Sequence, residues 1–153
     1  MQEVPAKRRD RLALRASTAY ILRSVDLMSR VVGGDILTGV IFTAIVNANI
    51  RHLRPADLVA QTYSELADPA PDEIRRPISV HALALELAVP YETTRRHVNR
   101  LIADGFCRRS DNGVVVPTEV LAREAIGTVL RKNYDNLRRL LGDLRDGGVE
   151  FKH

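Results

Sequence analysis

The sequence of 153 residues contains a single cysteine, Cys107, and no tryptophan. One cysteine excludes an intrachain disulfide and any zinc site built from several cysteines, and it is consistent with a reducing cytosol. Aromatic residues make up only 5% of the chain, so no aromatic cage for a ligand is evident. The chain also lacks a glycine-rich phosphate loop, a metal-spaced set of His, Cys and Asp, and a nucleophile motif. We therefore predict a protein that is not an enzyme and that has no cofactor and no bound metal.

Long apolar runs are missing as well. The most apolar stretch, Ile36 to Val46, has 11 residues, whereas a helix needs about 20 to span a bilayer. The N-terminus begins with charged residues and reaches no apolar segment typical of a secretory signal. With 45% hydrophobic and 27% charged residues, the composition is that of a soluble globular protein. The sequence predicts one compact, cytoplasmic unit without a membrane partner.

Positive charge is unevenly distributed along the chain. The net charge is +4 and the isoelectric point is about 9.6. Between Arg75 and Arg109 there are seven arginines and three acidic residues, so this segment carries the whole surplus. A local surplus of this kind is what binding to a phosphate backbone requires. The segment is therefore the first place to look for a nucleic-acid interface.

The N-terminal region, residues 1–77, is predicted to be helical. The apolar spacing places three helices at 10–32, from 36 to about 53, and at 55–67, followed by a proline-rich surface connection at 68–77. Gly33-Gly34 is expected to end the first helix and Asp35 to cap the second. Pro55 is expected to open the third.

Two short helices are predicted next, joined by a tight turn. Ser79 is a good N-cap for a helix over 80–88, and Pro90 suits the turn. A helix from Tyr91 has one apolar face, and Gly105 supplies its left-handed C-cap. The residues expected on that face are Thr94, Val98, Leu101 and Ile102.

A hairpin and a long helix complete the pattern. Two β-prone runs, 106–109 and 114–116, flank the turn sequence Ser-Asp-Asn-Gly, which is a strong hairpin signal. Thr118 is then expected to cap one long helix with a broad leucine-rich stripe that ends at Gly147. The stripe can serve as a dimerisation element, can fold back on the first two helices of the same subunit, or can do both. Residues 118–153 are assigned as a C-terminal dimerisation helix within the one compact unit.

The stretch "ISVHALALELAVPYETTRRHVNRLIADGFCRRSDNGVVVP", residues 78–117, resembles the winged helix-turn-helix domain of bacterial transcriptional regulators of the MarR-like, GntR-like and ArsR-like types. Cap, helix, turn, second helix, "LIADGF" exit and hairpin follow in the order of that domain. Thr94 departs from the pattern, in which Val or Ile is commoner, and this is expected to weaken packing. The resemblance covers about a quarter of the chain. It implies a mainly α fold: a winged helix-turn-helix with a small β-hairpin wing, flanked by N-terminal helices and a long C-terminal helix.

The resemblance also implies which side chains meet DNA. A major groove about 12 Å wide admits one α-helix, whose polar N-terminal residues reach base edges. Arg95 or Arg96 can bond bidentately to guanine and Asn99 to adenine, while the wing meets the backbone or the minor groove. The DNA-binding residues expected are Ser79, Tyr91, Glu92, Thr93, Arg95, Arg96, Asn99, Arg100, Arg108, Arg109 and Asn112.

Plainer interpretations stand beside these. The arginines can be only a solvated helix face, and a lone His97 or His81 is usually structural or on the surface. Cys107 is expected to be a small core or edge residue, with a redox sensor as the alternative. Polar residues on the apolar second helix can line a pocket or be satisfied core groups. They are Asp35, Asn47, Asn49 and His52.

The sequence therefore predicts a sequence-specific DNA-binding transcriptional regulator. The expected partners are double-stranded DNA and a second copy of the chain, bound through the N- and C-terminal helices. A crevice between the second helix and the last one can admit a small apolar effector, so modulation by a small ligand stays open from the sequence. The alternative is a winged helix that binds another protein without touching DNA, which salt bridges from Arg95 and Arg96 to acids of the same chain would favour.

Overall fold

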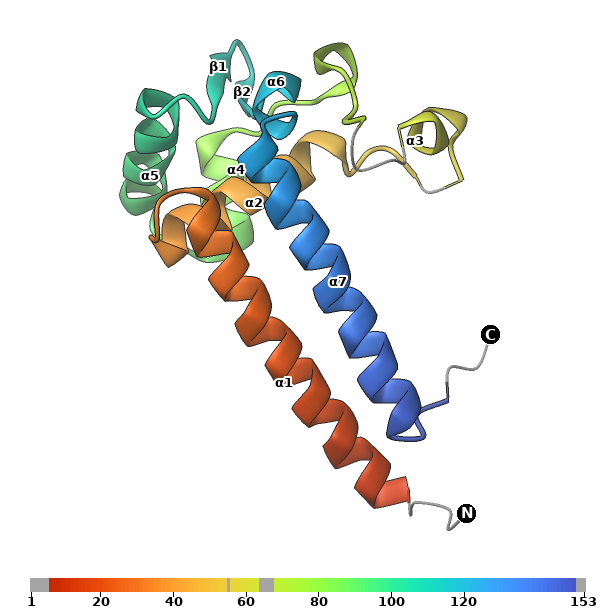
Figure 1. Cartoon of the computed structure of the whole chain (residues 1–153). Coiled ribbons are helices and arrows are strands. Elements are labelled where there is room, and N and C mark those ends of the chain that lie inside the picture. Colours follow the sequence, from red (N-terminus) through yellow and green to blue (C-terminus); the bar gives the residue numbers. More distant parts are fainter. Residues whose placement is uncertain (1–5, 55, 64–67, 151–153) are drawn as a thin grey trace.

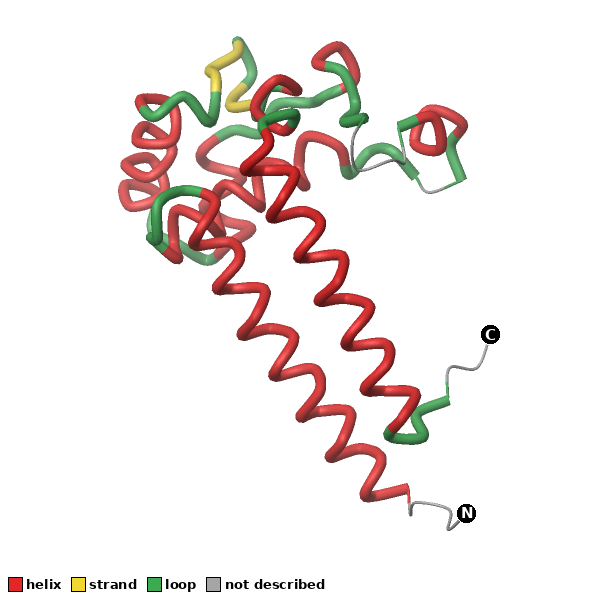
Figure 2. Tube along the Cα trace, viewed as in Figure 1, coloured by secondary structure: helices red, strands yellow, loops and turns green. Residues whose placement is uncertain are grey.

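A computed structural model describes residues 6–54, 56–63 and 68–150, and the statements below concern these residues. The chain is helical for most of its length and has one two-stranded antiparallel sheet (Figures 1 and 2). The elements are α1 (Ala6–Val31), α2 (Ile36–Ile50), α3 (Leu58–Thr62), the 3-10 turn η1 (Asp72–Ile74), α4 (Val80–Leu87), α5 (Tyr91–Ala103), β1 (Arg108–Ser110), β2 (Gly113–Val115), α6 (Thr118–Leu121) and α7 (Glu124–Asp146).

The fold has two parts. The long helices α1 and α7 run side by side as an arm, and the remaining elements gather at one end of it as a head (Figure 1). No single described helix is long and apolar enough to cross a membrane, although α1 and α2 together, bent by 91° where they meet, have the length and composition for it.

The core of the head joins α2 to the elements that follow it in sequence. Ile41 and Ile45 of α2 are fully buried, and Leu83 of α4 and Val98 of α5 pack into the same cluster. Each such side chain contributes about 1.5–3 kcal/mol by leaving water. The core therefore fixes α4 and α5 against α2, which is what positions the candidate site described below.

A close approach between α1 and α2 depends on a glycine. A Cβ atom at Gly39 would lie 2.3 Å from the carbonyl oxygen of Met28 in α1. Any larger residue would push the two helices apart. The absence of a side chain at this position therefore allows the close packing of α2 against the end of α1. Gly33-Gly34 ends α1 and the Asp35 carboxylate caps α2, as predicted.

The two short helices match the sequence prediction closely. The Ser79 hydroxyl oxygen accepts from the Ala82 N–H at 3.1 Å and so caps α4. Pro90 lies at the N-cap of α5, and the predicted face of that helix is buried or half-buried. Gly105 has the predicted left-handed conformation, with φ +77°. Thr94 is fully buried, and its hydroxyl donates to the Pro90 carbonyl at 3.1 Å, so its polar group is satisfied inside the core.

The hairpin is present, but its strands are shifted from the predicted runs. β1 and β2 pair with Ser110 opposite Gly113, so the turn is two residues, Asp111 and Asn112. Ile78 bridges Val114, donating and accepting backbone hydrogen bonds at 3.1 and 2.8 Å. This extra pairing ties the hairpin to the residue that precedes the α4 cap.

The single long C-terminal helix was a wrong prediction. The chain forms α6, breaks at Arg123 in an extended conformation, and restarts as α7. At the break, the Arg123 side chain donates to the Gly105 carbonyl at 2.9 Å and lies over the Phe106 ring. Thr118 is not a cap but the first residue of α6, and its hydroxyl donates to the Ala70 carbonyl at 2.7 Å. Contacts with distant segments thus accompany a break in the helix that the local sequence favours.

Two other predictions in the N-terminal region need correction. The third helix is only α3, because the exposed Leu58 and Val59 give it no face to bury; Pro55 and residues 64–67 lie outside the described part of the chain. The connection 68–77 is not purely a surface segment, since Ala70 and Arg75 are buried. The first helix also begins earlier than predicted, at Ala6, and the second ends earlier, at Ile50.

A polar network lies inside the arm. Asn136 of α7 is buried against α1, where its amide donates to the Tyr20 carbonyl at 3.3 Å and to the Ser24 hydroxyl at 3.0 Å. The Arg23 guanidinium donates to its amide oxygen. A buried amide between two helices favours one register over others, because any slip would leave it unpaired. The leucine stripe thus packs on α1 within one subunit, while Tyr134, Leu137 and Leu141 remain exposed.

Candidate nucleic-acid interface

The outward face of α5 is polar and exposed. The apolar side of the helix is buried in the head, so residues about half a turn away from Val98 must face solvent. Glu92, Arg95 and Arg96 are exposed there, and Asn99 is half-buried. Four of the predicted DNA-binding side chains therefore share one face of one helix.

The two arginines on this face differ in their partners. Arg95 donates to the Glu92 carboxylate at 2.9 and 3.0 Å, and this pairing raises the pKa of Arg95. Both side chains are largely exposed, so solvent screens the ion pair and it holds Arg95 only weakly. Arg96 has no salt-bridge partner among the described residues. The Arg95 guanidinium is therefore shared with a carboxylate, whereas the exposed Arg96 side chain forms no ion pair within the described part of the chain.

The hairpin contributes one arginine to this face and directs the other elsewhere. The Arg109 guanidinium donates to the side-chain oxygen of Asn99, which joins β1 to the outward face of α5. Neighbouring residues of a strand point to opposite sides, and Arg108 accordingly lies 3.7 Å from the Asp72 carboxylate. Asn112 is exposed at the hairpin turn. The structure thus brings Arg109 into the site and assigns Arg108 to an ion pair.

The remaining predicted residues surround the face rather than form it. The Tyr91 ring is exposed near His81, with ring centroids 6.4 Å apart. Thr93 is half-buried, and Arg100 lies 3.5 Å from Asp35 on the side of α5 that faces α2. Ser79 is exposed at the start of α4, where its oxygen is used as the helix cap.

A hydrogen-bond network that no sequence motif indicates holds α5 against the start of α2. The Thr38 hydroxyl donates to the Asp35 carboxylate at 2.6 Å and lies 2.7 Å from His97 Nδ1. Because the hydroxyl has one proton, His97 must donate to it through Nδ1–H. The Thr38 hydroxyl bond is the main reason why the pKa of Asp35 is lowered, with backbone N–H groups and His97 acting in the same direction. His97 is therefore structural, one of the two ordinary roles expected from the sequence, and it helps to position α5.

A second buried amide holds the hairpin. Asn49 of α2 is fully buried, and its amide donates to the Arg76 carbonyl at 2.7 Å and the Val114 carbonyl at 3.3 Å. Its oxygen accepts from the Val116 N–H at 2.9 Å. Asn49 is therefore a satisfied core group, one of the two interpretations open from the sequence. The first turn of α2 thus holds α5 through Thr38, and the last turn of α2 holds the hairpin through Asn49.

The charge surplus found in the sequence is only partly available at the surface. Arg75 is just 7% exposed, and its guanidinium donates to the Ala70 carbonyl at 3.2 Å. Burial lowers the pKa of Arg75, while Asp72 opposes that shift. The Thr118 N–H, which donates to the Asp72 carboxylate at 2.7 Å, is the largest cause of a lowered pKa for Asp72. Of the seven arginines in this segment only Arg75 is buried; the exposed ones are Arg76, Arg95, Arg96, Arg100, Arg108 and Arg109.

The single cysteine is placed where oxidation is hindered. Cys107 is 6% exposed, and burial raises the pKa of its thiol to about 12. A thiol that stays protonated is a poor nucleophile, which favours the core-residue interpretation over the redox sensor.

Among residues 6–54, 56–63 and 68–150, no three His, Cys, Asp or Glu side chains gather in a way that could hold a metal ion. No family model, curated protein or solved structure matches this chain.

Proposed function

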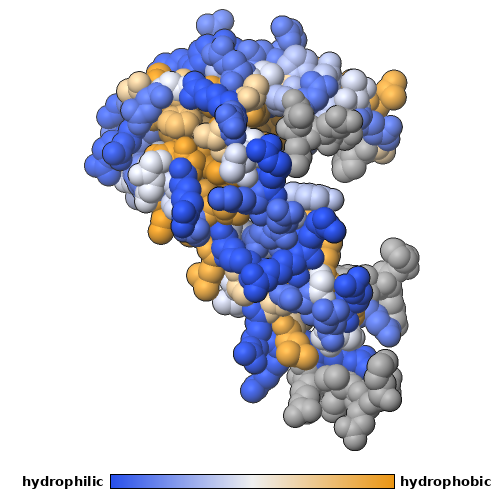
Figure 3. Space-filling model, viewed as in Figure 1, coloured by the Kyte–Doolittle hydropathy of each residue, from blue (hydrophilic) through white to orange (hydrophobic). Residues whose placement is uncertain are grey.

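We propose that this protein is a sequence-specific DNA-binding transcriptional regulator that acts as a homodimer, with residues 78–117 working as a winged helix-turn-helix. The observation that carries the proposal is the joining of the α5 outward face to the hairpin through Arg109 and Asn99. The helix has 13 residues and is therefore about 20 Å long, a size that a major groove admits. Figure 3 shows a largely hydrophilic surface over α5 and the hairpin.

The rigid support behind α5 strengthens the proposal. A helix that reads base edges must be held in a fixed orientation, since small displacements break bidentate hydrogen bonds. Thr38 and Asp35 fix α5 from one side, and Asn49 fixes the hairpin from the same helix. The arrangement presents Arg96, Arg109 and the hairpin turn as one surface.

The arm supports the homodimer. Several large apolar side chains remain exposed along it, and Figure 3 shows them interrupting the hydrophilic surface. Leu14 and Leu22 of α1 are 67% and 65% exposed, and Leu141 of α7 is 49% exposed. A second arm packed against these residues would cover them and would place two α5 helices at two half-sites of DNA.

The DNA proposal is tested by fluorescence anisotropy with a labelled mixed-sequence duplex at about 50 and about 200 mM salt. Wild type is compared with Arg95→Ala/Arg96→Ala and with the matched control Arg138→Ala/Arg139→Ala, an exposed arginine pair on α7. We expect salt-sensitive binding by wild type and the control. The α5 variant should bind more weakly and lose about two units of the salt slope. Equal binding by all three would refute the assignment of α5.

The dimer is tested by light scattering after size exclusion. Leu14→Glu/Leu22→Glu places charge on the arm, and Leu58→Glu places it on α3, at a residue 78% exposed. We expect a dimer for wild type and the α3 variant and a monomer for the arm variant. A wild-type monomer at all concentrations would refute this part of the proposal.

A protein-binding module without DNA contact is the second candidate. The Arg95 to Glu92 ion pair favours it, because it occupies one of the two central arginines. Failure of wild type to bind DNA at low salt, with the fold intact, would favour this candidate.

A further inference from the structure

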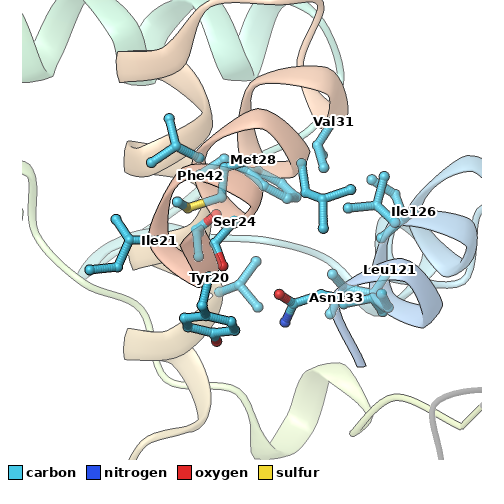
Figure 4. A pocket seen from close by; sticks show the side chains of 15 residues that line it. Tyr20, Ile21, Ser24, Met28, Val31, Phe42, Leu121, Ile126 and Asn133 are labelled. Atoms are coloured by element: carbon cyan, nitrogen blue, oxygen red, sulfur yellow. The ribbon is translucent and has the colours of Figure 1, made fainter. Parts of the chain in front are cut away.

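An apolar pocket lies where the arm joins the head. It has a volume of about 400 Å³ and is lined by parts of α1, α2, α6 and α7. None of its fifteen lining side chains is charged (Figure 4). Pockets of about 300–1,000 Å³ with mostly apolar walls and a few polar groups are typical small-molecule sites.

Two of the polar groups at the pocket are already engaged. The Ser24 oxygen accepts from Asn136 at 3.0 Å, and the Thr43 hydroxyl donates to the Gly39 carbonyl at 2.8 Å. The other two, the Tyr20 hydroxyl and the Asn133 amide, form no hydrogen bond within the described part of the chain. Figure 4 shows Tyr20 and Asn133 toward one end of the pocket, away from Val31. The pocket thus has an apolar body and a neutral polar end.

We propose that this pocket binds an uncharged, mainly apolar small molecule whose single polar group bonds to Tyr20 or Asn133. A charged ligand is disfavoured, because a buried charge needs a partner and the lining offers none. Burying a compact ring or a branched hydrocarbon skeleton against the apolar wall contributes about 25 cal/mol of favourable free energy for each Å² of apolar surface removed from water.

The position of the pocket links it to the candidate DNA interface, and this second half of the inference rests on the proposed function. Phe42, Thr43 and Val46 line the pocket from α2. The same helix holds α5 through Thr38 and the hairpin through Asn49. A ligand that packs against the middle of α2 therefore touches the support of both DNA-contacting elements, and its occupancy changes DNA affinity.

The binding site is tested with N-phenyl-1-naphthylamine, an uncharged fluorescent probe with one N–H group. Val129→Trp fills the pocket from α7, and Arg138→Trp is the matched control at an exposed position of the same helix outside the pocket. We expect saturable binding to wild type and the control, and binding about tenfold weaker for the filled variant. Absence of saturable binding, or equal binding by a folded Val129→Trp, overturns the proposal.

Three further measurements sharpen this test. The anilinonaphthalene sulfonate of the same skeleton should bind about tenfold more weakly than the uncharged probe, and equal affinity would overturn the uncharged class. Tyr20→Phe/Asn133→Leu, a substitution independent of pocket filling, should weaken the uncharged probe about threefold, and an unchanged affinity would overturn the assigned polar end. Light scattering at the same concentrations identifies the competing occupant, since loss of probe binding on dimerisation would show that a second copy fills the pocket.

The coupling is tested by repeating the DNA titration with saturating probe. We expect the DNA dissociation constant of wild type to change about fivefold or more and that of Val129→Trp to stay constant. Probe binding with an unchanged DNA affinity would overturn the coupling and leave the ligand site standing. If no DNA binds at all, the proposed function fails, while the probe titration still decides the ligand site.

Discussion

Replacing Asn49 is the most direct test of how the hairpin is held. Asn49→Ala leaves the Val116 N–H buried without a partner, at a cost of about 1–3 kcal/mol. The Val114 carbonyl keeps its bond from Ile78, but the Arg76 carbonyl loses the amide, which adds about 1 kcal/mol. With the small cavity that remains, we expect a loss of about 3 kcal/mol of unfolding free energy. That corresponds to a fall in Tm of about 6–12 °C for a chain of this size.

Asn49→Asp provides the matched control, because it keeps the shape and the acceptor oxygen but removes the donor. A buried carboxylate would face the Arg76 and Val114 carbonyls, so burial should raise its pKa above that of an unfolded aspartate. Protonation then favours the folded state, and the defect of this variant should shrink as the pH falls from about 7 to about 5. Thermal unfolding followed by circular dichroism measures the change in Tm, and urea unfolding at each pH measures the free energy of unfolding. A fall in Tm below about 2 °C for Asn49→Ala, or a pH-independent defect for Asn49→Asp, would refute the reasoning.

Three further predictions concern packing, pH and thiol reactivity. Gly39→Ala should destabilise by about 2 kcal/mol in urea unfolding, because its Cβ would lie 2.3 Å from a backbone oxygen of α1; Gly142→Ala, which meets no atom within 4 Å, should be neutral or stabilising. The lowered pKa of Asp72 implies stabilisation that is present above the ordinary value of 3.8 and is lost as the pH falls through the lowered pKa. The stability gap between wild type and Asp72→Asn should therefore be larger at about pH 7 than at about pH 3, and an equal gap would contradict it. Cys107 should react with a disulfide reagent only after unfolding in urea, since its thiol is buried and its pKa is raised to about 12; rapid labelling of the native protein would contradict this.

Local chemistry was enough to predict the centre of the fold. Ser79, Pro90 and Gly105 mark the ends of α4 and α5 through caps and backbone preferences that act within a few residues. The apolar spacing around Val98 identified the buried face of α5, and therefore also the face that carries Arg96. Such signals are readable because their physical causes lie inside the same short segment.

The errors occurred where distant segments compete for the same residues. Thr118 has the chemistry of a cap, but Ala70 and Asp72 use its hydroxyl and its N–H. Arg123 sits in a strong helical pattern, yet its contact with Gly105 and the Phe106 ring accompanies a break between α6 and α7. No local pattern contains these partners, because they are 17 to 48 residues away in the sequence.

The sequence by itself determined two short helices joined by a tight turn, the glycine that ends the second, the existence of a hairpin and the concentration of arginine around them. Only the tertiary structure decided that Arg75 is buried and that Arg108 lies beside Asp72, since both depend on how the connection before α4 packs. It also decided that α2 supports both halves of the candidate interface, through Thr38 and Asn49. A polar residue inside an apolar helix shows that some partner must exist, but only the fold shows which groups satisfy it.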